Sequence, residues 1–124
     1  MEFETLKGKT ITAIEGAIPG SELIEIFTSD SGKHWMQHQQ DCCESVSVED
    51  IVGNVEDLIG SPVLLAEEVS EEDPNASESG TWTFYKLATI KGSVTIRWYG
   101  SSNGWYGEEV SFYSAAIRES KESK

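Results

Sequence analysis

The side chains best suited to ligand binding in this sequence are aromatic, and they gather near one arginine. Nine of the twelve aromatic residues lie between Trp82 and Tyr113. Within this stretch, Arg97-Trp98-Tyr99 and Trp105-Tyr106 flank a short turn of glycine, serine and asparagine. A guanidinium among aromatic rings suits a planar ligand such as a nucleobase, or the centre of a protein interface. The same rings are equally typical of cross-strand pairs that stabilise a small β-sheet.

Side-chain alternation along the expected strands separates core residues from candidate binding residues. On the strand 93–99, Val94, Ile96 and Trp98 share one face and are assigned to the core. On the strand 105–113, Tyr106, Val110 and Phe112 take the same role. The opposite face then carries the candidate binding residues, which are Arg97, Tyr99, Trp105 and Tyr113. Asn103, in the turn between the two strands, is a further candidate.

A second group of side chains with metal-binding or nucleophilic chemistry lies upstream, and it consists of His34, His38, Asp41, Cys42, Cys43 and Glu44. Two histidines four residues apart on a strand are separated by ~13 Å, too far to bind one metal ion directly. The preceding turn favours a strand over the helix that would bring them together, so no metal site is predicted. Adjacent cysteines close no useful loop when bonded to each other, and free thiols in a reducing compartment are expected.

The acidic character of the chain limits its partners. Its formal net charge is −13, from 22 acidic and 9 basic residues. Such a charge repels nucleic acid and anionic membranes, and it favours a partner with a basic surface or serves solubility alone. The densest acidic segment includes Glu71, Glu72 and Asp73, which are therefore candidate contacts for a basic partner.

The motifs of common catalytic sites are missing from the sequence. It has no glycine-rich phosphate loop, no G-x-S-x-G nucleophile elbow and no H-E-x-x-H zinc motif. A binding protein without enzymatic activity and without a cofactor is therefore the expectation. The acidic start, Met1-Glu2-Phe3-Glu4, lacks the basic and apolar regions of a signal peptide, and no apolar run approaches the ~20 residues of a membrane span. A cytoplasmic protein is expected.

The elements that position these residues are mainly strands separated by turns. Strands are expected at residues 10–14, 23–28, 33–39, 44–46, 62–66, 81–90, 93–99 and 105–113, the last three as an antiparallel meander. The acidic segment 70–80 has no periodicity and is expected to be a mobile loop.

One amphipathic helix is expected to cover a face of this sheet. Its apolar positions follow the spacing of one helical face, and they are Val48, Ile51, Val52, Val55, Leu58 and Ile59. Ser47 with Asp50 resembles a capping box, and Gly60 and Pro62 supply a stop. The predicted fold class is therefore α+β, with a predominantly antiparallel meander and one packed helix. A single α+β domain spans residues 1–113, and residues 114–124 form a charged, frayed tail.

Several runs of this sequence resemble a small uncharacterised domain family found in bacteriophages and prophages. The runs are QDCCESV at 40–46, EDIVG at 49–53, DLIGSP at 57–62, TWTFYK at 81–86 and TIRWYGSSNG at 95–104. The resemblance as a whole extends over most of the chain, about residues 6–113. The family carries no assigned reaction, so the resemblance implies a phage or prophage accessory protein, a class that often antagonises host defences.

Two functions of different classes remain open. In the first, the chain binds and blocks a host protein, with acidic residues against a basic site and aromatic residues as anchors. In the second, it sequesters a nucleotide-like signal, with Arg97 on the phosphate and aromatic rings on the base. The second function requires Lys33, Lys86, Lys91 and Arg97 to converge, because the overall charge opposes an anionic ligand. A homo-oligomer is also compatible with the sequence.

Overall fold

Short runs of β-branched and aromatic residues, interrupted by glycine-rich turns, form eight antiparallel strands. In the computed structural model, which describes residues 3–116, the strands are β1 (Ile11–Glu15), β2 (Leu23–Thr28), β3 (Gly32–Gln37), β4 (Ser45–Val52), β5 (Leu65–Glu72), β6 (Ser79–Thr89), β7 (Gly92–Ser102) and β8 (Ser111–Ala116). Two single 3₁₀ turns, η1 (Phe3–Leu6) and η2 (Val55–Leu58), are the helical segments of this described part.

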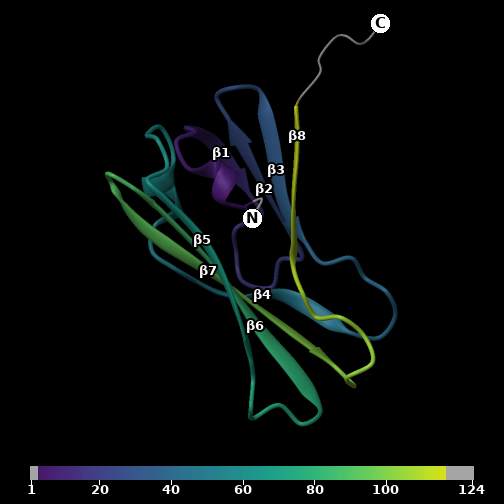
Figure 1. The fold of residues 1–124 in the computed structure, drawn as a ribbon. Coiled ribbons are helices and arrows are strands. Elements are labelled where there is room, and N and C mark those ends of the chain that lie inside the picture. Colours follow the sequence, from purple (N-terminus) through teal and green to yellow (C-terminus); the bar gives the residue numbers. More distant parts are fainter. Residues whose placement is uncertain (1–2, 117–124) are drawn as a thin grey trace, which may run out of the picture.

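The strands form two four-stranded sheets that pack against each other (Figure 1). The first sheet has the order β1-β2-β3-β8, and the second has the order β4-β7-β6-β5. The long β6–β7 hairpin dominates the second sheet, with paired residues from Ser79↔Ser102 to Thr89↔Gly92. The final strand β8 leaves this hairpin and pairs with β3 in the other sheet.

The core lies between the two sheets and contains the inward-pointing residue of each alternating pair. From the first sheet it receives residues such as Ile24, Ile26 and Met36. From the second sheet it receives Trp98 and Tyr85 among others. Because the period of a strand is two, every second residue of these strands points outward. Each sheet therefore has one buried face and one outer face.

The N-terminal 3₁₀ turn η1 contributes two fully buried side chains to this core. Phe3 and Leu6 have no exposed surface. The ring of Phe3 lies 4.6 Å from that of Tyr85 on β6 and 5.1 Å from that of Phe112 on β8. Phe3 thus contacts both sheets at once, and Figure 1 shows its turn between them.

The amphipathic helix expected at residues 48–59 is absent, and the α+β assignment is wrong. Ser45–Val52 forms strand β4, and only Val55–Leu58 turns as a 3₁₀ helix. A β-bulge between Val48 and Asp50 explains the error. Val48 pairs with Trp98 and Ile51 with Ile96, so one inserted residue changes the inward spacing from two to three. A spacing of three is also that of a helix.

The expected last strand of the meander, the acidic loop and the C-terminal tail also have different boundaries in the structure. The chain from 103 to 110 is irregular, and the last strand begins at Ser111. The acidic loop is shorter than expected, because β5 continues to Glu72 and β6 begins at Ser79. Residues 114–116 of the expected tail belong to β8, and 117–124 lie outside the described residues.

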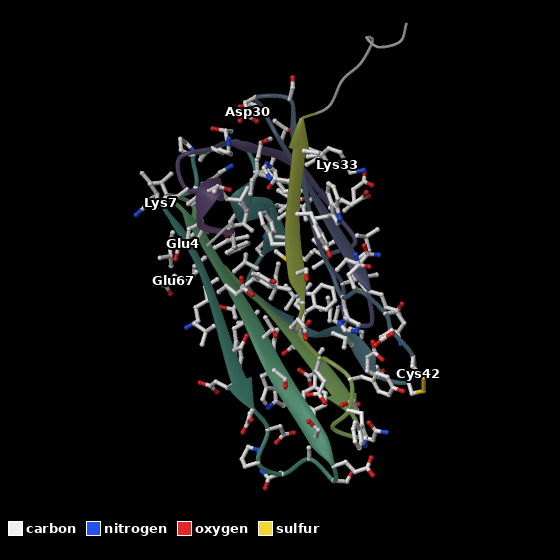
Figure 2. All side chains as sticks on the ribbon, turned by 45° about the vertical axis from the view of Figure 1, so that its right-hand side comes forward. Glu4, Lys7, Asp30, Lys33, Cys42 and Glu67 are labelled. Carbon is white, nitrogen blue, oxygen red and sulfur yellow. A yellow bond between two sulfur atoms is a disulfide. The ribbon has the colours of Figure 1, made fainter. Side chains whose placement is uncertain are left out.

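Two further findings concern the cysteines and the membrane. Cys42 and Cys43 are joined by a disulfide in the exposed turn before β4, so the expectation of two free thiols is wrong. Figure 2 shows Cys42 at the edge of the molecule. No helix among residues 3–116 has the length and apolar character needed to cross a membrane.

Candidate functional site

The outer face of the β4-β7-β6-β5 sheet carries a group of aromatic side chains around Arg97. Trp82 and Phe84 on β6 lie directly opposite Tyr99 and Arg97 on β7. All four side chains are half-buried. Val69 on β5 lies opposite Phe84 and is 38% exposed. These five residues are called the aromatic face below.

Arg97 is held at the centre of the aromatic face by one ring and two carboxylates. Its guanidinium lies 5.1 Å from the centre of the Trp82 ring, in cation–π contact. Its Nε donates to Glu49 Oε1 at 2.6 Å, and its Nη2 lies 3.6 Å from Asp50 Oδ2. Both carboxylates come from the bulge of β4. The arginine is therefore already paired with anions, which opposes its use for a phosphate.

Tyr99 links the aromatic face to the β5–β6 turn. Its ring lies 4.4 Å from the Trp82 ring, and its hydroxyl donates to Asp73 Oδ2 at 2.7 Å. That hydrogen bond raises the pKa of Tyr99, because ionised Asp73 disfavours a phenolate. Gly80 makes room for this ring, since an added Cβ would lie 2.1 Å from the Tyr99 hydroxyl.

The remaining candidate residues of the aromatic region lie elsewhere. Trp105 is 85% exposed in the irregular segment after β7. Asn103 is exposed in the same segment, and its side chain accepts the Trp105 N–H at 2.9 Å. Tyr113 lies on β8 in the first sheet, where its ring stacks on Trp35 at 5.5 Å. The structure brings Arg97 and Tyr99 together and separates them from Trp105 and Tyr113.

Acidic residues surround the aromatic face on two sides. Glu71 lies opposite Trp82 and shares its face of the sheet, whereas exposed Glu72 pairs with Thr81 and alternates to the other face. Asp73 follows and binds Tyr99. Because β5 is an edge strand, these carboxylates also oppose its pairing with a strand of another chain. The sequence predicted these acidic residues as binding candidates but not Trp82 and Phe84. These two alternate along β6 with Thr83 and Tyr85, which are buried, and this alternation is the signal that places them on the outer face.

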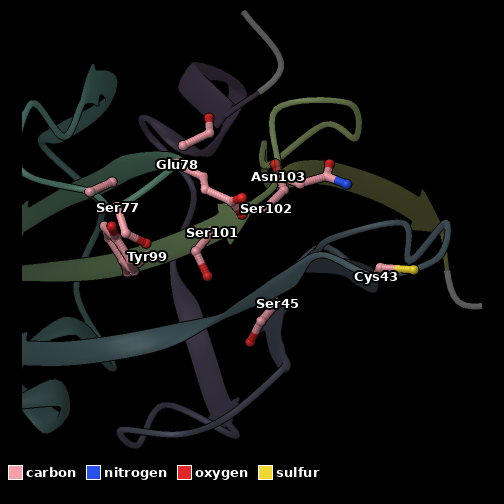
Figure 3. A pocket seen from close by; sticks show the side chains of 10 residues that line it. Cys43, Ser45, Ser77, Glu78, Tyr99, Ser101, Ser102 and Asn103 are labelled. Carbon is pink, nitrogen blue, oxygen red and sulfur yellow. The ribbon is translucent and has the colours of Figure 1, made fainter.

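A polar depression of about 360 Å³ adjoins the aromatic face at Tyr99 (Figure 3). Hydroxyl and amide groups dominate its wall, which is formed by Cys43, Ser45, Ala76, Ser77, Glu78, Ser79, Tyr99, Ser101, Ser102 and Asn103. One of its neighbours, Glu108, is buried and accepts hydrogen bonds from Thr81 and Ser102. Among the described residues, its wall includes no lysine or arginine and so offers no cation to an anionic ligand.

The four basic residues required for a nucleotide site do not converge. Lys33 lies on β3 in the first sheet, where it pairs with Glu25 at 2.9 Å. Lys91 donates to the carbonyl of Ile59 at the end of the β6–β7 hairpin. Lys86 is exposed on β6, two residues beyond Phe84. The aromatic face is left with Arg97 as its central cation.

His38 forms a buried ion pair with Glu44 rather than a metal site. Its Nε2 lies 2.7 Å from Glu44 Oε2, and its Nδ1 lies 2.7 Å from the carbonyl oxygen of Glu109. Burial lowers the pKa of His38, but these hydrogen bonds outweigh it and the pKa is raised. Hydrogen bonds from His38 and from backbone N–H groups lower the pKa of Glu44 to about 2. Within the described residues, no three histidine, cysteine or acidic side chains cluster as metal ligands.

These features define a small all-β domain of two packed sheets, with an aromatic and acid-rimmed outer face. The chain belongs to the family described as a domain of unknown function (DUF7448), whose model matches residues 4–112. The expected small uncharacterised domain family is thereby confirmed. No curated protein and no solved structure gives a significant match to the chain.

Proposed function

We propose that this chain is a binding protein whose aromatic face docks a basic segment of another protein. The observation that carries the proposal is the composition of this face. Trp82, Phe84 and Tyr99 offer large apolar surfaces at its centre, with arginine and tryptophan in direct contact. Aromatic and arginine residues at the centre of a patch are the residue types that contribute most to protein binding.

Charge complementarity defines the partner. The charge of Arg97 is compensated by Glu49 and Asp50, which leaves the acidic rim of the aromatic face, Glu71 on β5 and Asp73 after it, to meet positive charge. Lysine and arginine side chains of the partner would lie over this rim, and their attraction accelerates association more than it raises affinity. The resemblance to phage and prophage proteins makes a host protein the expected partner, with inhibition of a defence component as the outcome.

The nucleotide-binding alternative is the weaker proposal. A phosphate at Arg97 would have to displace two carboxylates, one of them bonded at 2.6 Å. Within the described residues, the five that form the aromatic face include no cation besides Arg97, and Lys86, two residues beyond Phe84, pairs with Thr95 and not with Arg97. The alternative requires a rearrangement of β4 at its bulge, whereas protein docking uses the face as it stands.

The experiment compares two tryptophans that lie on the outer faces of opposite sheets. Trp82→Ala removes an anchor of the aromatic face, and Trp35→Ala is the matched control on the first sheet. Immobilised wild type and both variants are incubated with bacterial lysate at low and high salt, and bound proteins and small molecules are identified by mass spectrometry. A partner of the aromatic face is lost with Trp82→Ala, retained with Trp35→Ala, and released by salt.

The result can also contradict the proposal. A protein retained equally by Trp82→Ala and wild type binds somewhere else, and the aromatic face is then not its site. A nucleotide released from the denatured wild type, and absent from an Arg97→Ala sample, favours the alternative.

A further inference from the structure

A continuous chain of hydrogen bonds joins four side chains at one end of the first sheet. Asp30 Oδ1 lies 2.6 Å from the hydroxyl of Thr28, and that hydroxyl lies 3.2 Å from His34 Nε2. On the other side of the ring, His34 Nδ1 lies 2.7 Å from Ser114 Oγ. His34 and Ser114 are direct cross-strand partners on β3 and β8. Figure 2 shows Asp30 at this end of the molecule, beside the end of β8.

The direction of each hydrogen bond follows from the acceptors available to Thr28. Its hydroxyl proton points to Asp30 or to the Gly32 carbonyl at 3.3 Å, and both groups only accept. The Thr28 oxygen must then accept a proton from His34 Nε2. Neutral His34 therefore carries its hydrogen on Nε2, and its Nδ1 lone pair faces the Ser114 hydroxyl.

Gly32 supplies independent support, because the network requires a residue without a side chain there. A Cβ at this position would lie 2.7 Å from Thr28 Oγ1, 2.9 Å from Asp30 Oδ1 and 3.1 Å from His34 Nε2. Any other residue would press on all three polar atoms. The turn from β2 to β3 thus leaves space for the hydrogen bonds that orient the imidazole.

Ser114 is accessible to small molecules, whereas His34 is protected. The side chain of His34 is 4% exposed and stacks on Phe112 with ring centres 5.8 Å apart. Ser114 is exposed and lines a depression of about 420 Å³ together with His34, Asp30 and Lys9. Nucleophile and base thus share one solvent-facing hollow.

We propose that Ser114 is a nucleophile activated by His34 as general base, and that it is acylated by small activated carboxylic esters. Thr28 and Asp30 are positioning residues, because they fix the tautomer of His34 without reaching the ester. The geometry is that of a serine–histidine pair with a third group that orients the base. The proposal is independent of the aromatic face, which belongs to the other sheet.

The reaction is an acyl transfer that needs no additional reactant. The Ser114 Oγ–H proton moves to His34 Nδ1 as Oγ forms a bond with the carbonyl carbon of the ester. The bond between that carbon and the leaving oxygen breaks, and the alcohol or phenolate departs. The proton passes from His34 to an alcohol leaving group, or to water when the leaving group is a stable phenolate. The product is an ester of Ser114.

The charged groups around His34 set the pH range of this reaction. Burial lowers the pKa of His34, the Lys9 ammonium lowers it further, and Asp30 opposes both. Lys9 itself pairs with Asp30 at 2.5 Å. His34 is therefore neutral at pH 7, and acylation of Ser114 declines only below the ordinary histidine pKa of about 6.5.

The test measures acetylation of the full chain by p-nitrophenyl acetate, with each site located by peptide mass spectrometry. Ser111 is an internal control, since it lies on the same strand opposite Gln37 and not opposite a histidine. General-base assistance predicts acetylation of Ser114 at least about 100-fold faster than that of Ser111. The rate at Ser114 should be constant above pH 7 and fall in acid.

Two variants assign the effect to the hydrogen-bond chain. His34→Gln should reduce acetylation of Ser114 to the rate of Ser111. Thr28→Val keeps His34 but removes the oxygen that accepts its Nε2–H. The imidazole can then carry its hydrogen on Nδ1, where it cannot take the proton of Ser114. The acetylation rate at Ser114 should therefore fall several-fold, and its pH profile should change. Each variant is read only after a cooperative thermal transition confirms that it is folded.

Three results would overturn the proposal. The first is equal acetylation rates at Ser114 and Ser111 in the wild type. The second is an unchanged rate at Ser114 in folded Thr28→Val. The third is a rate at Ser114 that stays constant when the pH is lowered from 6.5 into the acid range. In each case Ser114 would serve only as a hydrogen-bond partner for a buried histidine.

Discussion

Single residues in this protein take their chemistry from the strand opposite them. Arg97 lies opposite Phe84, next to Trp82 and within reach of Glu49, so its charge is compensated and its alkyl stem contributes to an apolar surface. Ser114 lies opposite a buried, neutral histidine, so its hydroxyl faces a lone pair. Neither environment is encoded by adjacent residues in the chain.

Two tryptophans of the aromatic-rich segment are expected to differ sharply in their contribution to stability. Trp105→Ala should change the free energy of unfolding by no more than about 0.5 kcal/mol, because the side chain is 85% exposed. Trp98→Ala should cost about 3–5 kcal/mol, because a fully buried ring leaves a cavity. Urea denaturation of both variants measures the difference. Similar losses would mean that Trp105 packs against the protein in solution.

The ion pair between His38 and Glu44 predicts a window of pH in which the fold is most stable. The pKa of Glu44 is lowered, so its contribution is complete above 4.5 and declines as the pH falls toward about 2. The pKa of His38 is raised, so its contribution is complete below 6.5 and declines as the pH rises through the raised value. The pair therefore stabilises most between pH 4.5 and 6.5.

Thermal melts of wild type and Glu44→Gln across the pH range measure this window. The difference in melting temperature should be largest between pH 4.5 and 6.5 and smaller on both sides. Glu22→Gln is the control, since Glu22 is an exposed carboxylate beside the same segment. A difference for Glu44→Gln that does not vary with pH would show that the two groups do not titrate as a pair.

At the scale of elements, the sequence predicted strands well where alternation was undisturbed and failed where one inserted residue disturbed it. The strand near residues 23–28 and the β6–β7 hairpin follow from period-two patterns and a short turn. The helix at residues 48–59 was wrong because the bulge of β4 imitates helical spacing. Local propensity cannot distinguish a bulged strand from a helix, since the pairing that makes β4 a strand is with β7, which lies far along the chain, from Val52↔Thr95 to Ser45↔Ser101.

The partners of the last strand were unpredictable for a related reason. A hairpin turn predicts pairing between neighbouring strands, yet β8 crosses to β3 after an irregular segment. Tyr113 therefore meets Trp35 and not the rings of β7. Arg97 and Tyr99 lie together because they alternate on the same strand, β7, whereas joining Trp105 and Tyr113 to them required a strand pairing that does not form.

Gly53 ends β4 in a conformation that other residues avoid, and this predicts a local cost of substitution. Its φ is +113°, and an added Cβ would lie 2.4 Å from the Ser93 carbonyl oxygen on β7. Gly53→Ala should destabilise the protein by about 1–3 kcal/mol in urea denaturation. Gly8→Ala is the matched control, because Gly8 also has positive φ but no atom within 4 Å of the added Cβ. Equal losses of unfolding free energy in the two variants would mean that backbone strain alone, and not the contact with Ser93, causes the destabilisation.

For the whole molecule, cohesion of the two sheets depends on a residue near the N-terminus. Phe3 contacts Tyr85 on one sheet and Phe112 on the other, and it is fully buried. Phe3→Ala should cost about 3–5 kcal/mol of unfolding free energy. Phe27→Ala on the half-exposed outer face of β2 should cost clearly less, as measured by urea denaturation of both variants. A comparable loss in the two variants would contradict the role of Phe3 between the sheets.

The crossing of β8 to the first sheet has a consequence for biosynthesis. Ser114 lies 80 residues after its partner His34 in the chain. During translation, at about 5–20 residues per second, the edge of β3 therefore stays unpaired for several seconds after it leaves the ribosome. The apolar, core-facing side of the first sheet also stays exposed until the β6–β7 hairpin has left the ribosome and can pack against it. The nascent chain thus exposes an open strand edge and an apolar face together, which makes this interval the time when a chaperone would be of most use to the protein.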